Sequence, residues 1–231
     1  RSAPKRSFFA ALDGYLGGVE ISYETSDVEN DPFLSLSFVS MLFEDADAAR
    51  AAIDASRDGY PELLWEASDE SFDYSGILEV DKPSIGDDGA TYAGVIESLS
   101  EEFSDFGYIL HHIQVGPMVL AMQAYSYEEV PTEESEAILE SVIARNIDLP
   151  AKPIDGSDPN ATIWEWVPTP ADLPGSYSET SRLWRNAAGD EFAVDAEVES
   201  DGTIRDFFAS IGGYVGGASV TYNLTEFDAD A

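Results

Sequence analysis

One block of sequence occurs twice in this chain, near its two ends. The first copy, residues 6–23, reads RSFFAALDGYLGGVEISY, and the second copy, residues 205–222, reads RDFFASIGGYVGGASVTY. The copies align without a gap, and half of their positions are identical, including the phenylalanine pair, the tyrosines and three glycines. A gapless match in such rare residue types indicates an internal duplication, which constrains the fold more than any other feature.

The block predicts a helix, a glycine corner and a strand. Four apolar residues of the second copy share one helical face: Ile204, Phe207, Phe208 and Ile211. Gly212-Gly213 then ends the helix, because glycine enters the left-handed cap conformation without steric cost. Apolar and polar residues alternate over positions 218–224, as in a half-buried strand. We expect the two copies to adopt the same conformation.

The duplicated unit is predicted to be incomplete at both ends of this sequence. An alternating strand, Glu191 to Glu199, precedes the second copy, whereas only a few residues precede the first. We therefore expect one unit over residues 1–149 that lacks its first strand, a proline-rich linker over residues 150–174, and the start of a second, homologous unit over residues 175–231. Such half-units invite completion, because an empty strand position exposes unpaired backbone groups. We expect the region from Asp172 onward to complete a sheet by packing against the middle region of another chain or of its own.

The region between the copies predicts an α+β fold, with antiparallel strands and with helices packed on one face of the sheet. Strands are expected at residues 33–43, 63–65, 77–80 and 91–96. Phe106–Val115 and Met118–Tyr127 form a predicted hairpin about Gly116-Pro117. Helices are expected at residues 45–57 and 132–146, and the second has Thr132 as its N-cap. The linker is expected to be extended.

The composition excludes several classes of binding partner and of metal site. The chain has 46 acidic and 11 basic residues, only three of them lysines, and a formal net charge of −35. Such a surface repels nucleic acids and anionic lipids, which we exclude as partners. The absence of cysteine excludes disulfides and thiolate metal sites, and no apolar run is long enough to span a membrane.

The middle region resembles a bacterial domain type. The run YILHHIQVGPMVLAMQAYSY from Tyr108, followed by the helical run TEESEAILESVIARNI, resembles extracytoplasmic lipoprotein and sensor-type α+β domains of bacteria. In those domains two apolar strands joined by a V-G turn precede a terminal helix, and residues 171–175 resemble the start of a second such unit. The resemblance implies a secreted or cell-surface location and carries over no catalytic residue.

Catalytic chemistry has little support in the sequence. The two histidines, His111 and His112, are adjacent on a predicted strand, so they point to opposite faces and do not form a paired site. His111 shares its face with apolar residues, which favours a hydrogen-bonded core histidine over a catalytic one. Acidic pairs for glycoside hydrolysis are not excluded, but nothing singles one out. We expect a protein that is not an enzyme.

Calcium is the one cofactor with some support. Asp155, Asp158 and Asn160 place three oxygen ligands in a predicted turn, and Asp27, Glu29 and Asp31 alternate along a second loop. The alternative is a chance cluster, since acids are abundant throughout this chain.

Two further short patterns bear on the surface. Asn160 and Asn223 each begin an N-glycosylation sequon, which can also arise by chance. Trp164 and Trp166 point the same way if the linker is extended, and large aromatic side chains need a surface to cover them. That surface is either their own chain or a neighbouring subunit, in which case the two tryptophans form an assembly contact.

Two function classes follow. The first is a structural subunit of the cell surface that assembles with itself, because chains with half a unit at each end can join head to tail. The alternative is an extracytoplasmic ligand-binding or sensor module, which requires an apolar pocket with converging polar groups.

The charge generates a prediction about salt. If the acidic surface is adapted to high ionic strength, thermal stability should rise steeply between low salt and molar potassium chloride, because salt screens the repulsion. Calorimetry across a salt series measures this, and a flat response would indicate an ordinary secreted protein.

Overall fold

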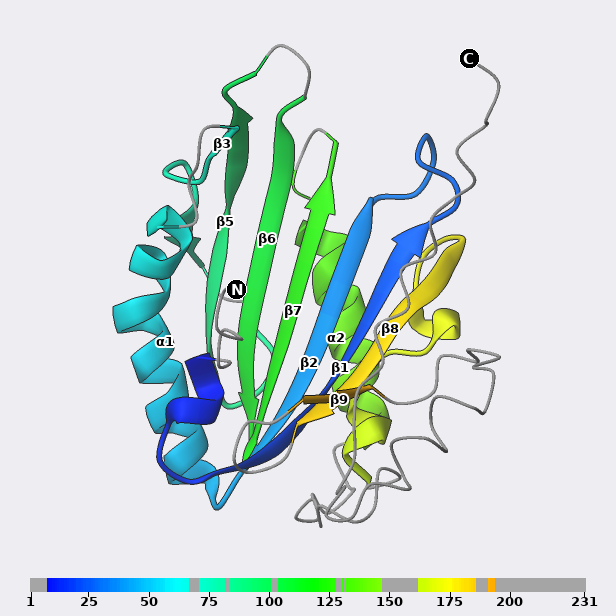
Figure 1. The fold of residues 1–231 in the computed structure, drawn as a ribbon. Coiled ribbons are helices and arrows are strands. Elements are labelled where there is room, and N and C mark those ends of the chain that lie inside the picture. The colour runs from blue at the N-terminus through cyan, green and yellow to red at the C-terminus, as the bar shows by residue number, and fades with distance from the viewer. Residues whose placement is uncertain are drawn as a thin grey trace, which may run out of the picture.

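An antiparallel sheet with helices on both faces forms the structure (Figure 1). The computed structural model describes residues 8–66, 71–81, 84–100, 104–127, 130, 132–146, 162–185 and 191–193. Its nine strands are β1 (Tyr15–Thr25), β2 (Ser35–Phe43), β3 (Phe72–Asp73), β4 (Leu78–Val80), β5 (Asp88–Ser98), β6 (Phe106–Val115), β7 (Met118–Ser126), β8 (Tyr177–Arg185) and β9 (Glu191–Ala193). The helices are η1 (Phe8–Ala11), α1 (Ala46–Glu66), α2 (Thr132–Asn146), η2 (Thr162–Trp166) and η3 (Pro170–Asp172). The predicted α+β class is confirmed.

The strand order is β3-β5-β6-β7-β2-β1-β8-β9, and β4 also pairs with β5. The predicted hairpin of β6 and β7 is confirmed, with Val115 opposite Met118 and with Gly116 at a φ of 56°. Glycine suits this place because a two-residue hairpin turn requires a positive φ that side chains disfavour. The hairpin puts two long apolar strands at the centre of the sheet.

The expectation that the helices pack on one face is wrong. Ser56 of α1 contacts His112, whereas Ser135 of α2 contacts His111. Adjacent strand residues point to opposite faces, so α1 and α2 lie on opposite sides of the sheet. The physical reason is the composition of β6, whose residues 107–114 are all buried and which therefore needs a cover on each side.

The face under α2 carries the largest apolar core. Its buried residues come from the central strands, from α2 and from the segment after it, and include Tyr23, Phe38, Ile109, Leu120, Ile138 and Val142. The predicted inward face of α2 is confirmed, since Ile138, Val142 and Ile143 are buried. Apolar burial at this density is the main stabilising contribution to the fold.

The first copy of the repeat forms a short helix followed by a strand. Its helix, η1, is a single 3-10 turn, and Gly14 follows with a φ of 80°. The strand begins at Tyr15, earlier than the alternation predicts, and its pairing with β2 shifts register between Tyr15 and Gly17, just before Gly18. The second copy lies outside the described residues, so the predicted likeness of the two copies stays a prediction.

Helix α1 extends further than the sequence indicates. It continues past the expected end at Arg57 to Glu66, and the strand expected at residues 63–65 lies within it. The ring of Tyr60 stacks on that of Tyr92, with centroids 5.7 Å apart, and meets His112 edge-on at 5.0 Å. This packing favours a helix where Gly59 and Pro61 predict its end.

The segment after α2 docks on the same face as α2. Residues 162–166 form a 3-10 helix, so the extended linker expected there is wrong for these residues. Trp166 is 3 % exposed within the main core, and its carbonyl oxygen accepts a hydrogen bond from Ser40 Oγ. Arg145 of α2 binds Asp172 at 2.6 Å, while the Tyr23 hydroxyl donates to the Pro168 carbonyl at 2.8 Å. Tertiary contacts thus position this proline-rich stretch.

Strand β8, which the sequence did not indicate, fills the position beside β1. It pairs antiparallel with β1 from Thr25↔Tyr177 to Gly18↔Arg185. The predicted empty strand position is therefore occupied by the same chain in this structure. Of the strand expected over residues 191–199, the described part is β9, which pairs with β8.

Tyr177 provides a test of this docking. Its ring is 8 % exposed in the main core, and its hydroxyl accepts from the Phe33 N–H at 3.0 Å and donates to the Phe33 carbonyl at 3.1 Å. We expect Tyr177→Ala to lower the free energy of unfolding by about 3–5 kcal/mol and Tyr177→Phe by about 1–3 kcal/mol, because Phe removes only the hydrogen bonds. Urea unfolding measures both. Wild-type stability for both variants would contradict the docking of β8, and a loss that depends on protein concentration would place the docking between chains.

Candidate functional site

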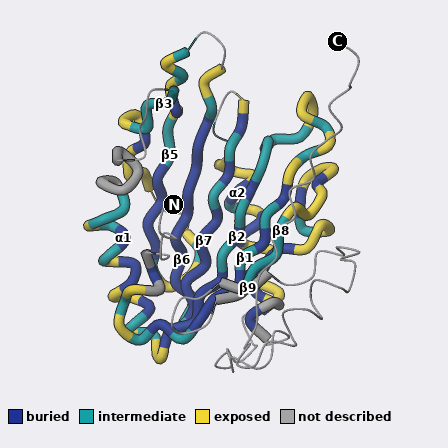
Figure 2. The backbone as a smooth tube through the Cα atoms, in the orientation of Figure 1, coloured by how far each residue is buried: buried dark blue, intermediate teal, exposed yellow. Residues whose placement is uncertain are grey.

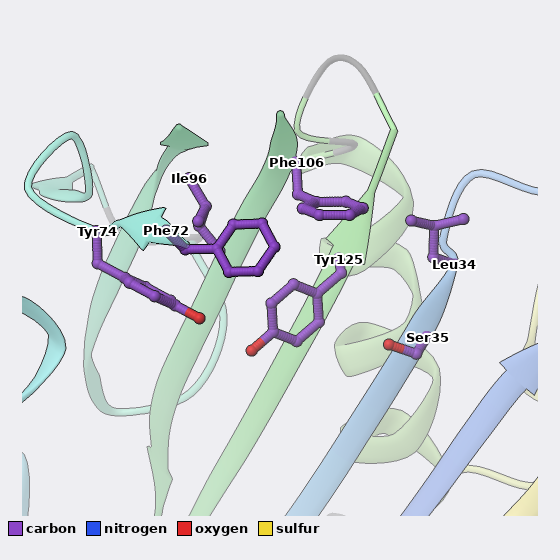
Figure 3. Close-up of a pocket in the computed structure, with 7 residues that line it drawn as sticks. All are labelled: Leu34, Ser35, Phe72, Tyr74, Ile96, Phe106 and Tyr125. Atoms are coloured by element: carbon purple, nitrogen blue, oxygen red, sulfur yellow. The ribbon is translucent and has the colours of Figure 1, made fainter. Parts of the chain in front are cut away.

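An aromatic pocket opens on the α1 side of the sheet, at the end where β5, β6 and β7 meet the loop before β2 (Figure 3). Its volume is about 380 Å³, within the range of sites for small organic ligands. Seven residues line it: Leu34, Ser35, Phe72, Tyr74, Ile96, Phe106 and Tyr125. We call this the aromatic pocket.

The sheet register builds the pocket. Ile96 lies opposite Phe106 across β5 and β6, and Tyr125 lies opposite Ser35 across β7 and β2, so these side chains share one face. Phe72 reaches the same place from the short strand β3, and its ring centroid lies 5.9 Å from that of Phe106. The rings of Phe72, Phe106 and Tyr125 surround a common space (Figure 3).

Tyrosine hydroxyls supply polar groups near the pocket. Gln123 Nε2 donates a hydrogen bond to the Tyr125 hydroxyl. Burial first, and then the nearby Tyr74, raises the pKa of Tyr125 to about 12. Tyr108 lies opposite Tyr125 across β6 and β7. Burial and the neighbouring Tyr60 and Tyr125 raise the pKa of Tyr108 well above its ordinary value. These groups therefore stay neutral and act as hydrogen-bonding hydroxyls at physiological pH.

A polar strip of sheet borders the pocket. Three α1-side residues of β1 and β2 are half-buried and form hydrogen bonds among themselves: Glu20, Ser22 and Ser37. Figure 2 shows this part of the sheet as intermediate in burial, whereas the centre of β6 is buried. The pocket therefore lies between a packed core and an accessible polar surface.

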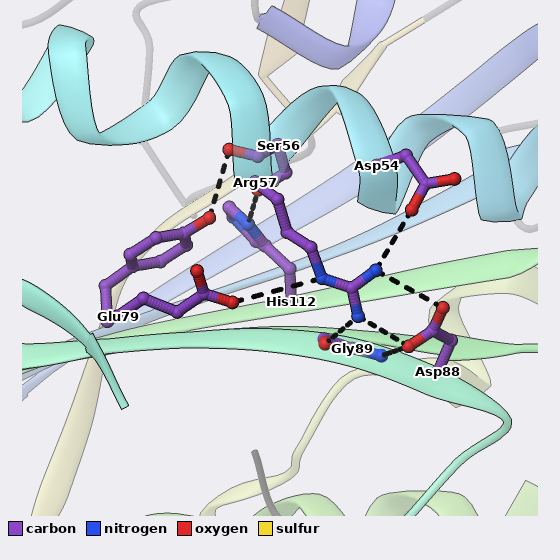
Figure 4. A network of polar contacts seen from close by, with 8 residues as sticks. Asp54, Ser56, Arg57, Glu79, Asp88, Gly89 and His112 are labelled. Atoms are coloured by element: carbon purple, nitrogen blue, oxygen red, sulfur yellow. Dashed lines mark hydrogen bonds and ion pairs between the residues drawn. The ribbon is translucent and has the colours of Figure 1, made fainter. Parts of the chain in front are cut away.

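His112 belongs to a buried network under α1 (Figure 4). Its Nδ1 lies 2.6 Å from Ser56 Oγ, and the Tyr92 hydroxyl donates to the Ser56 carbonyl at 3.0 Å. The ring of Phe9 meets the imidazole edge-on at 4.9 Å. His112 is 1 % exposed and Ser56 is fully buried, so a substrate does not reach this pair.

On the α2 side of the sheet, both ring nitrogens of His111 also have hydrogen-bond partners. Thr91 Oγ1 lies 2.9 Å from its Nδ1, and Ser135 Oγ lies 2.8 Å from its Nε2. Burial lowers the pKa of His111 to about 4, and burial with the neighbouring His111 lowers that of His112 to about 3. Two neutral rings held by hydroxyl groups fit the predicted core role, and they do not provide a relay to a nucleophile.

Arg57 joins α1 to the edge of the sheet beside this network (Figure 4). Its guanidinium binds Asp88 at 2.6 Å and the Gly89 carbonyl at 2.6 Å, and it contacts Asp54 at 3.0 Å. Glu79 of β4 lies 3.9 Å away. This arrangement fastens α1, β4 and β5 together, and its acids are engaged in structural contacts.

The predicted calcium ligands Asp155, Asp158 and Asn160 lie outside the described residues, as do both sequon asparagines, Asn160 and Asn223. In the second acidic loop, Asp31 accepts from Thr25 Oγ1 at 2.5 Å and from the Ser176 N–H at 2.9 Å, and Asp27 accepts from Asn30. Within the described residues, no three His, Cys, Asp or Glu side chains gather closely enough to hold a metal ion. The calcium site and the glycosylation sites stay predictions.

Of the two predicted assembly residues, Trp166 is buried in the core of its own chain, and its indole nitrogen has no hydrogen-bond partner. The side chain of Trp164 is not among those described. Both residues belong to the 3-10 helix η2, so the backbone here is not the extended segment on which the expectation that they point the same way rests. Their contact with another subunit stays a prediction.

Comparisons with protein-family models, with curated proteins and with solved structures found no match to this chain. Within the described part of the chain, no helix combines the length and the apolar character needed to cross a membrane. The site is therefore interpreted from its geometry.

The sequence analysis missed the aromatic pocket. A signal existed in the alternation of aromatic residues on one face of two paired strands: Phe106, Tyr108, Tyr125 and Tyr127. The other half of the lining, Phe72 and Tyr74, comes from a segment whose position only the fold determines.

The histidines generate a prediction about pH. Because both pKa values lie below the 6.5 of an exposed ring, the neutral rings contribute stability above pH 6.5 that is lost as the pH falls toward 4 and 3. We expect His112→Asn to have a lower free energy of unfolding than wild type at pH 7, since it loses ring packing. Between pH 7 and pH 4, however, its free energy of unfolding should fall by about 2–3 kcal/mol less than that of wild type. Urea unfolding at each pH measures the difference, in which the effects of the many carboxylates cancel. Parallel curves would contradict the buried, neutral state of His112.

Proposed function

We propose that this protein is an extracytoplasmic binding module that holds a ligand with a compact apolar body in the aromatic pocket. The observation that carries the proposal is the pocket itself, with four aromatic side chains around a space of about 380 Å³. Aromatic rings give large contact areas at low entropic cost, and the tyrosine hydroxyls and Ser35 add hydrogen-bonding groups at the wall.

The exposure of the lining supports a binding role. Phe72, Tyr74, Phe106 and Tyr125 are only partly buried, although aromatic residues of this size normally contribute to a core. Tyr127 (51 % exposed) extends the apolar surface next to the pocket, and its ring lies 6.1 Å from that of Phe106. Apolar surface that stays accessible beside a pocket is typical of binding sites.

The proposed role is not catalytic. Both histidines are buried, and the hydrogen bonds of their rings go to Ser56, Thr91 and Ser135. The extracytoplasmic location rests on the resemblance of the middle region and on the acidic composition.

A self-assembling structural subunit was the first function expected from the sequence. That expectation rested on an empty strand position, and β8 of the same chain occupies the position beside β1. No contact among the described residues favours assembly over binding, so assembly stays a prediction.

A matched pair of variants tests the binding role. Ser35→Phe places a ring into the pocket, whereas Ser181→Phe places the same ring on the same side of the sheet at β8, away from the pocket. We expect the neutral dye Nile red to bind wild type and Ser181→Phe saturably, and to bind Ser35→Phe about tenfold more weakly or worse, because the space is filled. Fluorescence titration measures the affinity, and circular dichroism verifies the fold. Equal affinity in all three proteins would contradict the proposal.

A further inference from the structure

We propose that the ligand of the aromatic pocket is an organic cation with a methylated ammonium group. The inference rests on the proposed function, since it names the class of ligand for the same pocket. It is carried by the combination of an aromatic lining with a strongly acidic surrounding.

The lining has the composition that recognises such cations. Four of its seven side chains are aromatic, and the other three are Leu34, Ser35 and Ile96. The face of an aromatic ring carries partial negative charge, so rings that surround a space attract a cation, and a quaternary ammonium loses little hydration on entry.

The lining contains no charged group that would oppose or replace this interaction. No lysine, arginine, aspartate or glutamate is among the seven residues. The Tyr74 and Tyr125 hydroxyls provide neutral oxygen atoms. A primary ammonium, which needs strong hydrogen-bond acceptors, is therefore less suited to the pocket than a methylated one.

Carboxylates stand beside the lining residues along their strands. Asp73 follows Phe72, Glu97 follows Ile96, and Asp105 precedes Phe106. Because adjacent strand residues point to opposite faces, Asp73 and Glu97 do not touch the pocket and act on it through their electrostatic field. Asp73 lies opposite Glu97 across β3 and β5, so two of these acids are neighbours at the sheet edge. Charges within one Debye length of the pocket raise the local concentration of cations and lower that of anions.

The charge of the whole chain acts in the same direction. With a formal net charge of −35, the protein repels anionic ligands before they reach the pocket. Three of the described arginines form ion pairs with residues outside the lining: Arg57 with Asp88, Arg145 with Asp172, and Arg182 with Glu179. A ligand with an apolar body and a positive charge is complementary to both the pocket and the acidic surface around it.

Three probes of nearly the same shape distinguish the contribution of ligand charge to the affinity from the contribution of apolar contact. Choline is the cation, 3,3-dimethylbutan-1-ol is its neutral counterpart, and 3,3-dimethylbutanoate is the anion. Each competes with Nile red for the full chain at constant ionic strength. We expect choline to bind about tenfold more tightly than the alcohol, and the anion to bind most weakly.

Two variants assign the preference to the pocket. Phe106→Leu keeps an apolar side chain and removes one ring, so we expect it to reduce choline affinity severalfold and to leave the alcohol almost unchanged. Ser181→Ala, on the same side of the sheet at β8, is the control and should behave as wild type. Circular dichroism and Nile red affinity show that each variant retains the fold and the pocket.

The outcomes distinguish this inference from the proposed function. Equal binding of choline and the alcohol would overturn the cation preference and leave the apolar site in place. A choline preference that Phe106→Leu does not change would assign the cation to the acidic surface and would also overturn the inference. Failure of all three probes to displace pocket-bound Nile red would overturn it too, whereas loss of Nile red binding itself bears on the proposed function.

Discussion

The structure depends on the burial of β6 on both of its faces. Eight successive residues of this strand are buried, so the sheet needs a helix on each side. The adjacent histidines in its middle connect to both covers, His111 to Ser135 of α2 and His112 to Ser56 of α1. Buried polar rings are costly without partners, so these hydroxyl contacts make the position of each helix specific as well as stable.

The two faces are not covered to the same extent, and the site arises from this asymmetry. On one face, α2 and the docked segment that contains Trp166 complete a continuous core over the central strands. On the other face, α1 and η1 cover part of the sheet and leave half-buried serines and acids on β1 and β2. The aromatic pocket lies where the packed part of this face ends. Aromatic side chains that would form core under a longer cover remain accessible to a ligand.

Two of the described arginines have structural roles. Arg57 joins α1 to β4 and β5, and Arg145 joins α2 to η3 through Asp172. Hydrogen bonds from Thr169 and Arg145 outweigh the opposing effect of burial and lower the pKa of Asp172 to about 2. With 46 acidic and 11 basic residues, the chain has too few cationic side chains to pair with most of its carboxylates. The resulting negative field is a property of the surface that any ligand of the pocket meets first.

The sequence alone determined the local elements that have strong periodicity or clear end signals. The alternation of β2, the Gly116-Pro117 hairpin and helix α2 were all predictable, because each depends on neighbouring residues only. The core role of His111 followed from its alternation with apolar residues.

The tertiary structure decided which faces are covered and what lies beside what. The end of α1 at Glu66 depends on Tyr60 packing against Tyr92, a contact that overrides the local signals of Gly59 and Pro61. Strand β8 has a polar sequence, and it is a strand because β1 offers it unpaired backbone groups. The aromatic pocket combines Phe72 with Phe106 and Tyr125, which are far apart in the chain and meet only through the sheet register. Side-chain spacing determines local elements, whereas contacts between distant segments depend on the energy of the whole fold.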